Sequence, residues 1–196
     1  DLYDLARLIC DGYGYRYGEL NRGHLPGYVV RTADAWEALL LSALKAGLKD
    51  RKVHKKSHFL GRHSFVGRSR SSLSIEPDVT VKKGDQIVLV VDAKYKASED
   101  GKLSIGRQDV YESLSFLRAT GCKRAVLLYP SNRNLCTRLS PGTAGIFERI
   151  DIEGFEIFGM EVDPRGFHRK GGFRTFYQNL AGNIYALETC ADSDHI

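Results

Sequence analysis

The sequence predicts an α/β fold in which helices flank a central mixed sheet. Three observations favour it: an amphipathic helical pattern before residue 50, two short apolar runs after it, and a second helical pattern between those runs. Short continuous apolar runs are typical of strands buried on both faces. With 196 residues, of which 42% are hydrophobic, the chain can build one sizeable core. We therefore expect a single domain over residues 1–196.

The first two elements are a short helix and a loop. Leu2, Leu5 and Ile9 fall near helical spacing, and the Gly- and Tyr-rich stretch 12–27 then ends the pattern. The tyrosines of this stretch either pack the loop onto the core or stack on nucleic-acid bases. Because the chain opens without methionine and inside a helical pattern, we expect it to be the C-terminal part of a longer protein.

The next element is an amphipathic helix over residues 33–48. Trp36, Leu40 and Leu44 repeat at helical spacing and Gly47 lies near the end, while Glu37 lies on the first turn.

A basic block follows, with no acidic residue between Asp50 and Glu76. It is either a surface that meets phosphates or a solvated pair of strands with a flexible loop, and the sequence favours neither interpretation. On the first interpretation, the DNA-binding residues are Lys52, Lys55, Lys56, Arg62, Arg68 and Arg70.

The remaining elements alternate between strands and helices. Residues 79–81 and 87–91 predict two strands joined by the tight turn 82–85, which contains Gly84. A helix over residues 107–119, closed by Gly121, separates them from an apolar strand over residues 125–129. Residues 155–162 predict a further strand. The apolar pattern of residues 173–187 predicts a last helix that covers the core or forms a dimer contact.

Two carboxylates and a lysine lie at the ends of neighbouring strands. Asp78 opens one strand, and Asp92 and Lys94 end the apolar strand that follows it. Strands joined by a short hairpin are neighbours, so the two acids can meet, and residues two apart point to the same face. Such a pair binds a hard divalent cation, which activates water and neutralises phosphoryl charge. The pattern favours phosphodiester hydrolysis over a surface ion pair of Asp92 with Lys94.

Other chemistries lack their motifs. The four cysteines show no zinc-ligand spacing, no Gly-x-Ser-x-Gly elbow is present, and residues 61–69 do not form a nucleotide-binding P-loop. The absence of a disulfide pattern fits a cytoplasmic protein, and no apolar run is long enough to span a membrane.

The motif order resembles the PD-(D/E)XK nucleases, with an acid on a first helix, Pro-Asp, and then Asp/Glu-x-Lys on the next strand. It resembles the McrC family in particular, the nuclease subunit of McrBC-type modification-dependent restriction systems. The segments that carry this likeness, in order, are Leu25-Pro26-Gly27-Tyr28, Trp36-Glu37, Pro77-Asp78-Val79, Asp92-Ala93-Lys94-Tyr95-Lys96, Asp109-Val110-Tyr111 and Leu127-Leu128-Tyr129-Pro130.

This resemblance implies a site as well as a fold. Asp78, Asp92 and the backbone carbonyl of Ala93 would hold Mg²⁺, for which Mn²⁺ could substitute, and Lys94 would serve the attacking water. Glu37 would complete the metal or water shell. Where the family tends to have glutamine, this chain has Glu112, and Gln108 one turn earlier is the alternative auxiliary residue.

It also implies partners. The chain would cut DNA in defence against foreign DNA, together with an McrB-like AAA+ GTPase motor, and could pair as a homodimer to cut both strands. A non-catalytic DNA-binding scaffold, and a repair nuclease or junction resolvase, remain as alternatives.

Overall fold

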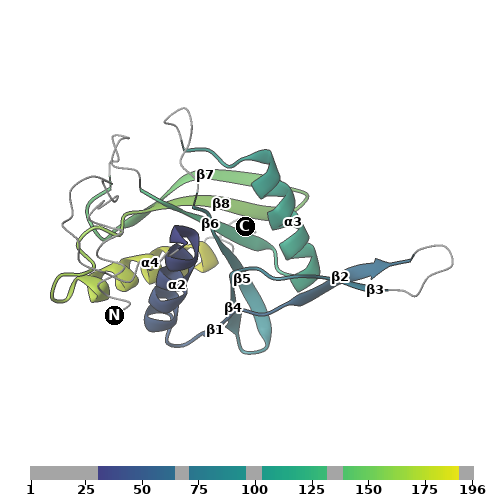
Figure 1. Cartoon of the computed structure of the whole chain (residues 1–196), viewed down its shortest axis with the longest axis horizontal. Coiled ribbons are helices and arrows are strands. Elements are labelled where there is room, and N and C mark those ends of the chain that lie inside the picture. Colours follow the sequence, from purple (N-terminus) through teal and green to yellow (C-terminus); the bar gives the residue numbers. More distant parts are fainter. Residues whose placement is uncertain (1–30, 65–70, 96–102, 132–138, 190–196) are drawn as a thin grey trace, which may run out of the picture.

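The computed structural model describes residues 31–64, 71–95, 103–131 and 139–189. In this part a six-stranded sheet carries helices on both faces, and a two-stranded ribbon projects from one side (Figure 1). The elements in chain order are α2 (Thr32–Gly47), β1 (Lys52–His54), β2 (His58–His63), β3 (Ser71–Ile75), β4 (Val79–Lys83), β5 (Gln86–Ala93), α3 (Arg107–Thr120), β6 (Arg124–Pro130), β7 (Ala144–Ile152), β8 (Phe155–Val162) and α4 (Gly172–Thr189).

The sheet is mixed, as the sequence predicts. Its strand order is β1-β4-β5-β6-β8-β7, with β6 parallel to both β5 and β8 and the other pairs antiparallel. Helix α3 is the crossover between the parallel strands β5 and β6, so it begins near the end of β5 that carries Asp92.

Two apolar cores cover the two faces of the sheet. Helices α2 and α4 pack on one face, where Leu40, Leu44 and Phe176 are almost fully buried. Helix α3 packs on the other through Phe116 and Leu117. Alternate residues of β5 serve the two cores, and Asp92 lies on the face of α3.

Most predicted elements match the observed ones to within two residues. The C-terminal helix covers the core, which was one of its two expected roles, and Ile184 is fully buried. Strand β7 was not predicted. In the basic block, the structure shows β1, which joins the six-stranded sheet and was not predicted, and a separate pair of strands, β2 and β3, which we call the arm.

Some predictions lie outside the described residues, among them the helix at residues 2–9, the loop 12–27, Arg68 and Arg70. Among the helices that the structure describes, none is long and apolar enough to cross a membrane.

Candidate active site

The two predicted acids meet at one edge of the sheet. Val79 of β4 pairs with Val91 of β5, and this antiparallel register, continued by one residue, sets Asp78 opposite Asp92. The Ala93 backbone N–H donates a hydrogen bond to Asp78 Oδ2 at 2.8 Å. The hairpin therefore fixes both carboxylates beside the end of β5.

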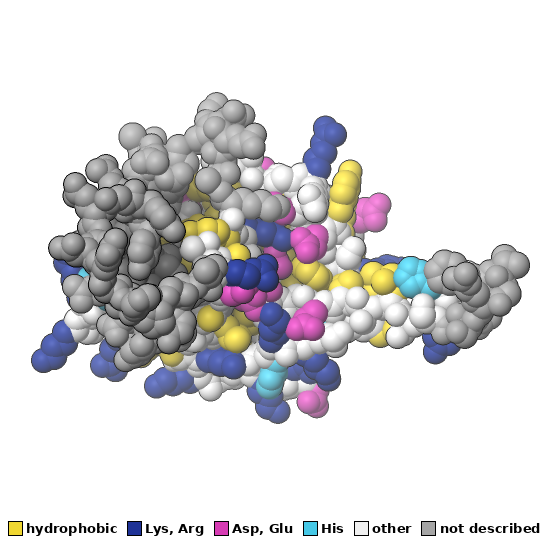
Figure 2. Space-filling view, in the orientation of Figure 1, with side chains coloured by type: hydrophobic (Ala, Val, Ile, Leu, Met, Phe, Trp, Pro, Cys, Tyr) yellow, Lys and Arg dark blue, Asp and Glu magenta, His cyan; other side chains and the backbone are white. Residues whose placement is uncertain are grey.

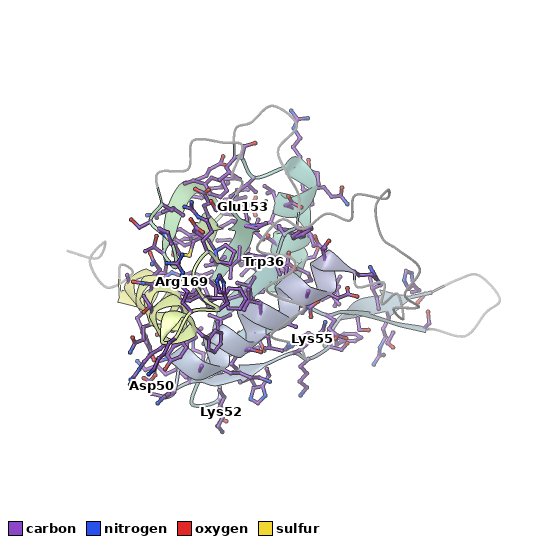
Figure 3. All side chains as sticks on the ribbon, turned by 60° about the vertical axis from the view of Figure 1, so that its left-hand side comes forward. Trp36, Asp50, Lys52, Lys55, Glu153 and Arg169 are labelled. Atoms are coloured by element: carbon purple, nitrogen blue, oxygen red, sulfur yellow. The ribbon has the colours of Figure 1, made fainter. Side chains whose placement is uncertain are left out.

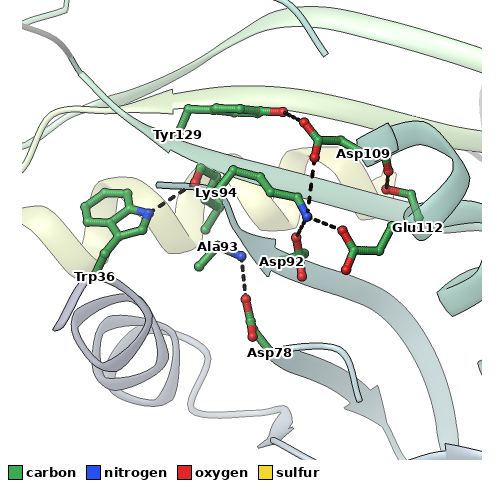
Figure 4. A network of polar contacts seen from close by, with 10 residues as sticks. Trp36, Asp78, Asp92, Ala93, Lys94, Asp109, Glu112 and Tyr129 are labelled. Carbon is green, nitrogen blue, oxygen red and sulfur yellow. Dashed lines mark hydrogen bonds and ion pairs between the residues drawn. The ribbon is translucent and has the colours of Figure 1, made fainter. Parts of the chain in front are cut away.

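Lys94 lies inside a group of acids contributed by β5 and α3 (Figure 4). Its Nζ is 2.5 Å from Asp92 Oδ2, 2.6 Å from Glu112 Oε2 and 3.6 Å from Asp109 Oδ1. Asp92, Lys94 and Asp109 are 6%, 7% and 3% exposed. Charges this deeply buried are tolerated only when they are paired, so the ammonium and the acids hold one another in place.

Asp109 has a second partner on the central strand. The Tyr129 hydroxyl donates a hydrogen bond to Asp109 Oδ2 at 3.1 Å, from β6 to α3. Burial raises the pKa of Tyr129, and the neighbouring Asp109 raises it further, so the phenol stays protonated and donates. The carboxylate that faces Lys94 is thereby anchored from behind.

One backbone oxygen connects the candidate site to helix α2. The Leu128 carbonyl accepts hydrogen bonds from the Lys94 backbone N–H at 2.9 Å and from Trp36 Nε1 at 3.2 Å. Trp36 belongs to α2, and its side chain is buried in the core. The Leu128 carbonyl therefore holds both helix α2 and the backbone at Lys94 against β6.

Glu37 is on the next position of α2 and forms an ion pair with Lys55. In Figure 3, Lys55 is labelled on the side of the molecule from which the arm extends. Glu37 lies close enough to Asp78 for its charge to raise the pKa of that acid. The structure thus brings Glu37 to the border of the site, paired with a basic residue.

Burial governs the protonation of the two central acids. It raises the pKa of Asp92 to about 6, Lys94 opposes the shift, and Asp78 adds to it. Burial also raises the pKa of Asp78, against the hydrogen bond from the Ala93 N–H. For Lys94 burial acts against the charge, but Asp92 and Glu112 outweigh it and raise the pKa, so the ammonium is permanent at neutral pH.

The donor set is made of oxygen atoms alone. Asp92 Oδ2 is buried, and within the described ranges it has no well-aligned hydrogen-bond donor, only its ion pair with Lys94. No three His, Cys, Asp or Glu side chains gather at metal-ligand distance in the part that the structure describes. Two carboxylates with a backbone carbonyl and water nevertheless suit Mg²⁺, which binds through few protein ligands. The residues present therefore fit that ion.

The structure separates the two auxiliary candidates. Glu112 contacts Lys94, whereas Gln108 is exposed at the start of α3. Of the predicted DNA-binding residues, Lys55 borders the site and Arg62 lies on the arm. Lys52 is on the outer strand β1, opposite Lys82. Figure 2 shows acidic and basic side chains side by side near the root of the arm.

Two residues of the network had no predicted role. Asp109 and Tyr129 stand in the motifs that carry the family resemblance, but the sequence alone did not pair them. An acid in the first turn of a helix usually faces solvent, where it interacts favourably with the positive end of the helix dipole. The signal that could have revealed Asp109 is its helical spacing, because it lies four residues before Ser113 and seven before Phe116, on the buried face of α3.

Comparison with known proteins bears on the fold and the family of the chain. The chain matches a solved structure from Thermococcus gammatolerans, the refined half-complex of a tetradecameric assembly of McrB AAA+ hexamers with bound McrC. The match has a TM-score of 0.53 and 18% identity, and covers 81% of this chain but 34% of that one. The chain thus spans about a third of the length of the matched protein, and the likeness shows the fold. The search of curated proteins gave no match.

A family model gives the family directly. The model described as McrBC 5-methylcytosine restriction system component matches residues 1–130. The matched residues include both central acids, Lys94 and the whole of α3. Because this is well over half of the 196 residues, the chain belongs to the McrBC 5-methylcytosine restriction system component family.

Proposed function

We propose that this chain is the DNA-cleaving subunit of a McrBC-like restriction system and hydrolyses phosphodiester bonds with Mg²⁺. The observation that carries the proposal is the edge of the sheet where Asp78 lies opposite Asp92, with Lys94 beside them. This is the arrangement that the PD-(D/E)XK resemblance implies. Membership of the McrBC family supports a restriction system as the setting of this reaction. We place the reaction in the cytoplasm, in defence against foreign DNA, as part of the same proposal.

The charge at this edge supports a divalent cation. Asp78, Asp92, Asp109 and Glu112 supply four carboxylates, while one ammonium, that of Lys94, lies among them. When all are ionised the group keeps a net negative charge, which is costly in a half-buried site. Asp78, Asp92 and the Ala93 carbonyl would hold Mg²⁺, which when bound neutralises phosphoryl charge and lowers the pKa of water.

Lys94 would act as a cation and hydrogen-bond donor. Its raised pKa leaves no lone pair at neutral pH, so it cannot take a proton from water. It can hold the attacking water in line or stabilise the charge that grows on the phosphoryl oxygens. Glu112 and Asp109 keep its Nζ at that position.

We also propose that the chain works with a motor. The matched assembly holds McrB AAA+ hexamers with bound McrC, and this chain resembles part of it in fold. An McrB-like AAA+ GTPase would supply nucleotide hydrolysis and bring DNA to the nuclease. Two nuclease chains would then be needed to cut the two strands of a duplex.

Plasmid cleavage tests the proposal. The chain is assayed alone and with its cognate motor subunit, in Mg²⁺ and in EDTA, and wild type is compared with Asp92→Ala. We expect cleavage that needs Mg²⁺ and is lost in Asp92→Ala. Asp85→Ala is the matched control, because Asp85 is an exposed acid in the β4–β5 turn and should leave cleavage intact.

Two results would overturn the assignment. Cleavage that survives Asp92→Ala would show that the bond is cut elsewhere or by a contaminant. Tight DNA binding without cleavage, alone or with the motor subunit in Mg²⁺ or Mn²⁺, would show a DNA-binding scaffold with the nuclease fold.

A further inference from the structure

The arm is rooted at the candidate active site. Only Glu76 and Pro77 separate the end of β3 from Asp78, and only Lys56 and Ser57 separate Lys55 from β2. Helix α3, which carries Glu112, also contacts both strands of the arm. A duplex bound at the acids would therefore lie close to the root of the arm.

The two faces of the arm differ. Phe59 pairs with Ser74 and Arg62 with Ser72, and cross-strand partners lie on the same face. We call this set the outer face of the arm. All four of its residues are exposed, and Phe59 is 58% exposed. The opposite face turns Ile75 toward the core beneath α3.

A β-bulge creates the outer face. Phe59 and Arg62 are three apart, so a regular strand would point them to opposite faces. The register shifts between Phe59 and Gly61, which lets Arg62 return to the face of Phe59. The Arg62 guanidinium lies over the Phe59 ring, 6.0 Å from its centroid. The bulge thus places an aromatic ring and a guanidinium together, opposite two serines of the neighbouring strand.

The chemistry of this face suits a polyanion. The sequence between Asp50 and Glu76 has no acidic residue, so nothing on the described arm offsets Arg62. A guanidinium and two hydroxyls donate hydrogen bonds to phosphate oxygens, and arginine can also read guanine edges. An apolar protein partner would instead favour a wider aliphatic patch.

The dimensions suit duplex DNA. The five residues of β3 extend by about 17 Å at roughly 3.3 Å per residue. The major groove of B-DNA, about 12 Å wide, admits a two-stranded ribbon. Over that length the arm would follow about five base pairs.

We propose that the arm is a DNA-contacting ribbon whose outer face binds the duplex next to the bond that is cut. This inference rests on the proposed nuclease function and adds a second contact surface to it. The arm holds the duplex along its groove, while the acids at its root meet one phosphate.

Equilibrium binding of duplex DNA in EDTA tests this surface without cleavage. We expect Arg62→Glu to weaken binding by about tenfold or more, and Arg62→Gln to lower the salt slope of log Kd by about one. Arg169→Glu makes the same charge change at the other end of the molecule from the arm (Figure 3) and should have a much smaller effect. Arg62 is exposed, so thermal melting should stay unchanged.

A positional measurement adds a second readout. A photoreactive phenylalanine analogue at position 59 should cross-link within about five base pairs of the cleaved bond. Equal DNA affinity of wild type and Arg62→Glu, or cross-links spread evenly along the duplex, would overturn the inference even if the chain cuts DNA. If Arg62→Glu loses DNA binding but the wild type cuts no DNA, DNA binding by the arm would be supported and the nuclease proposal rejected.

Discussion

At the scale of single residues, Lys94 is the most constrained group at the candidate site. Three carboxylates surround its ammonium, and the backbone N–H of the same residue is bonded to β6. A cation fixed by that many partners loses little entropy when a phosphate arrives. The Lys94 ammonium would then assist a reaction by holding its positive charge at one fixed position.

Replacing Lys94 tests that role. Lys94→Met should lower the rate of plasmid cleavage by about 100-fold or more, the usual loss when one transition-state donor is removed. Mg²⁺ should still bind, because the substitution removes a competing cation. Initial rates and calorimetric Mg²⁺ titration measure the two effects. Lys83→Met, at the exposed end of the β4–β5 hairpin, is the control; full activity of Lys94→Met would refute the role.

The raised pKa of Asp92 predicts a pH dependence of metal binding. Asp92 has a pKa of about 6 and must lose its proton to bind Mg²⁺, so affinity should be constant above pH 7 and fall below pH 6. The decline should approach tenfold per pH unit, because proton and metal compete for one carboxylate. The rise in Tm caused by Mg²⁺ reports this affinity and should be measured from pH 5 to 8. A rise that is the same at pH 5 and 8 would contradict the expectation.

At the scale of elements, helices α2 and α4 pack unusually closely. A Cβ added to Gly47 would lie 2.7 Å from both the Ala181 Cβ and the Tyr177 carbonyl oxygen. Glycine therefore serves helix packing here, rather than merely ending α2 as the sequence suggests. Because α2 carries Trp36 and Glu37, this contact also helps to place the border of the site.

Two glycine substitutions should have opposite effects on stability. Gly47→Ala gains up to about 1 kcal/mol of helix propensity but must separate two helices, at a typical cost of about 1–3 kcal/mol. We expect net destabilisation. Gly182→Ala on α4 meets no atom within 4 Å and should stabilise the chain by about 0.5–1 kcal/mol. Urea unfolding measures both, and a stabilised Gly47→Ala would show that the helices move apart freely.

The elements also show what the sequence could and could not predict. Apolar runs and helical spacing identified α2, β5 and β6, because those patterns reflect burial directly. Strand β7 was missed: it is an edge strand, and charged residues such as Arg149 and Asp151 occupy exposed positions on it, so no apolar run marks it. The approach of Asp78 to Asp92 could be predicted, because a short turn makes β4 and β5 neighbours.

The Asp109–Tyr129 hydrogen bond could not be anticipated in the same way. It joins a helix to a strand through tertiary packing, which leaves no local pattern in the sequence. For the same reason, the ordered motifs indicated that these two residues matter without showing that they touch each other.

At the scale of the whole molecule, the described residues hold one cluster of this kind, at one edge of one sheet. If the proposed function holds, a single cluster of this type would cut one strand at a time. The number of sites in the assembly would then determine the product, and two chains would have to pair to cut both strands.

Mixing experiments test this pairing. Double-strand cleavage by wild type should rise more steeply than linearly with protein concentration, while nicking rises linearly. An equal mixture of wild type and Asp92→Ala should shift plasmid products toward nicked circles, because mixed pairs cut one strand. Gel analysis of the products distinguishes these cases. The amount of linear plasmid could instead depend only on the amount of wild-type chain, whether or not Asp92→Ala is added. That result would show that a monomer cuts both strands.

The turn between β4 and β5 has a practical consequence. Gly84 adopts a φ of 61°, and a Cβ there would touch nothing within 4 Å. The strands of this hairpin carry Asp78 and Asp92 at their other ends, six and eight residues from Gly84, which is about 20 Å or more at roughly 3.3 Å per residue. A fluorophore attached at Asp85, or a short epitope inserted beside it, would label the molecule for imaging or surface capture while leaving the candidate active site and the arm free.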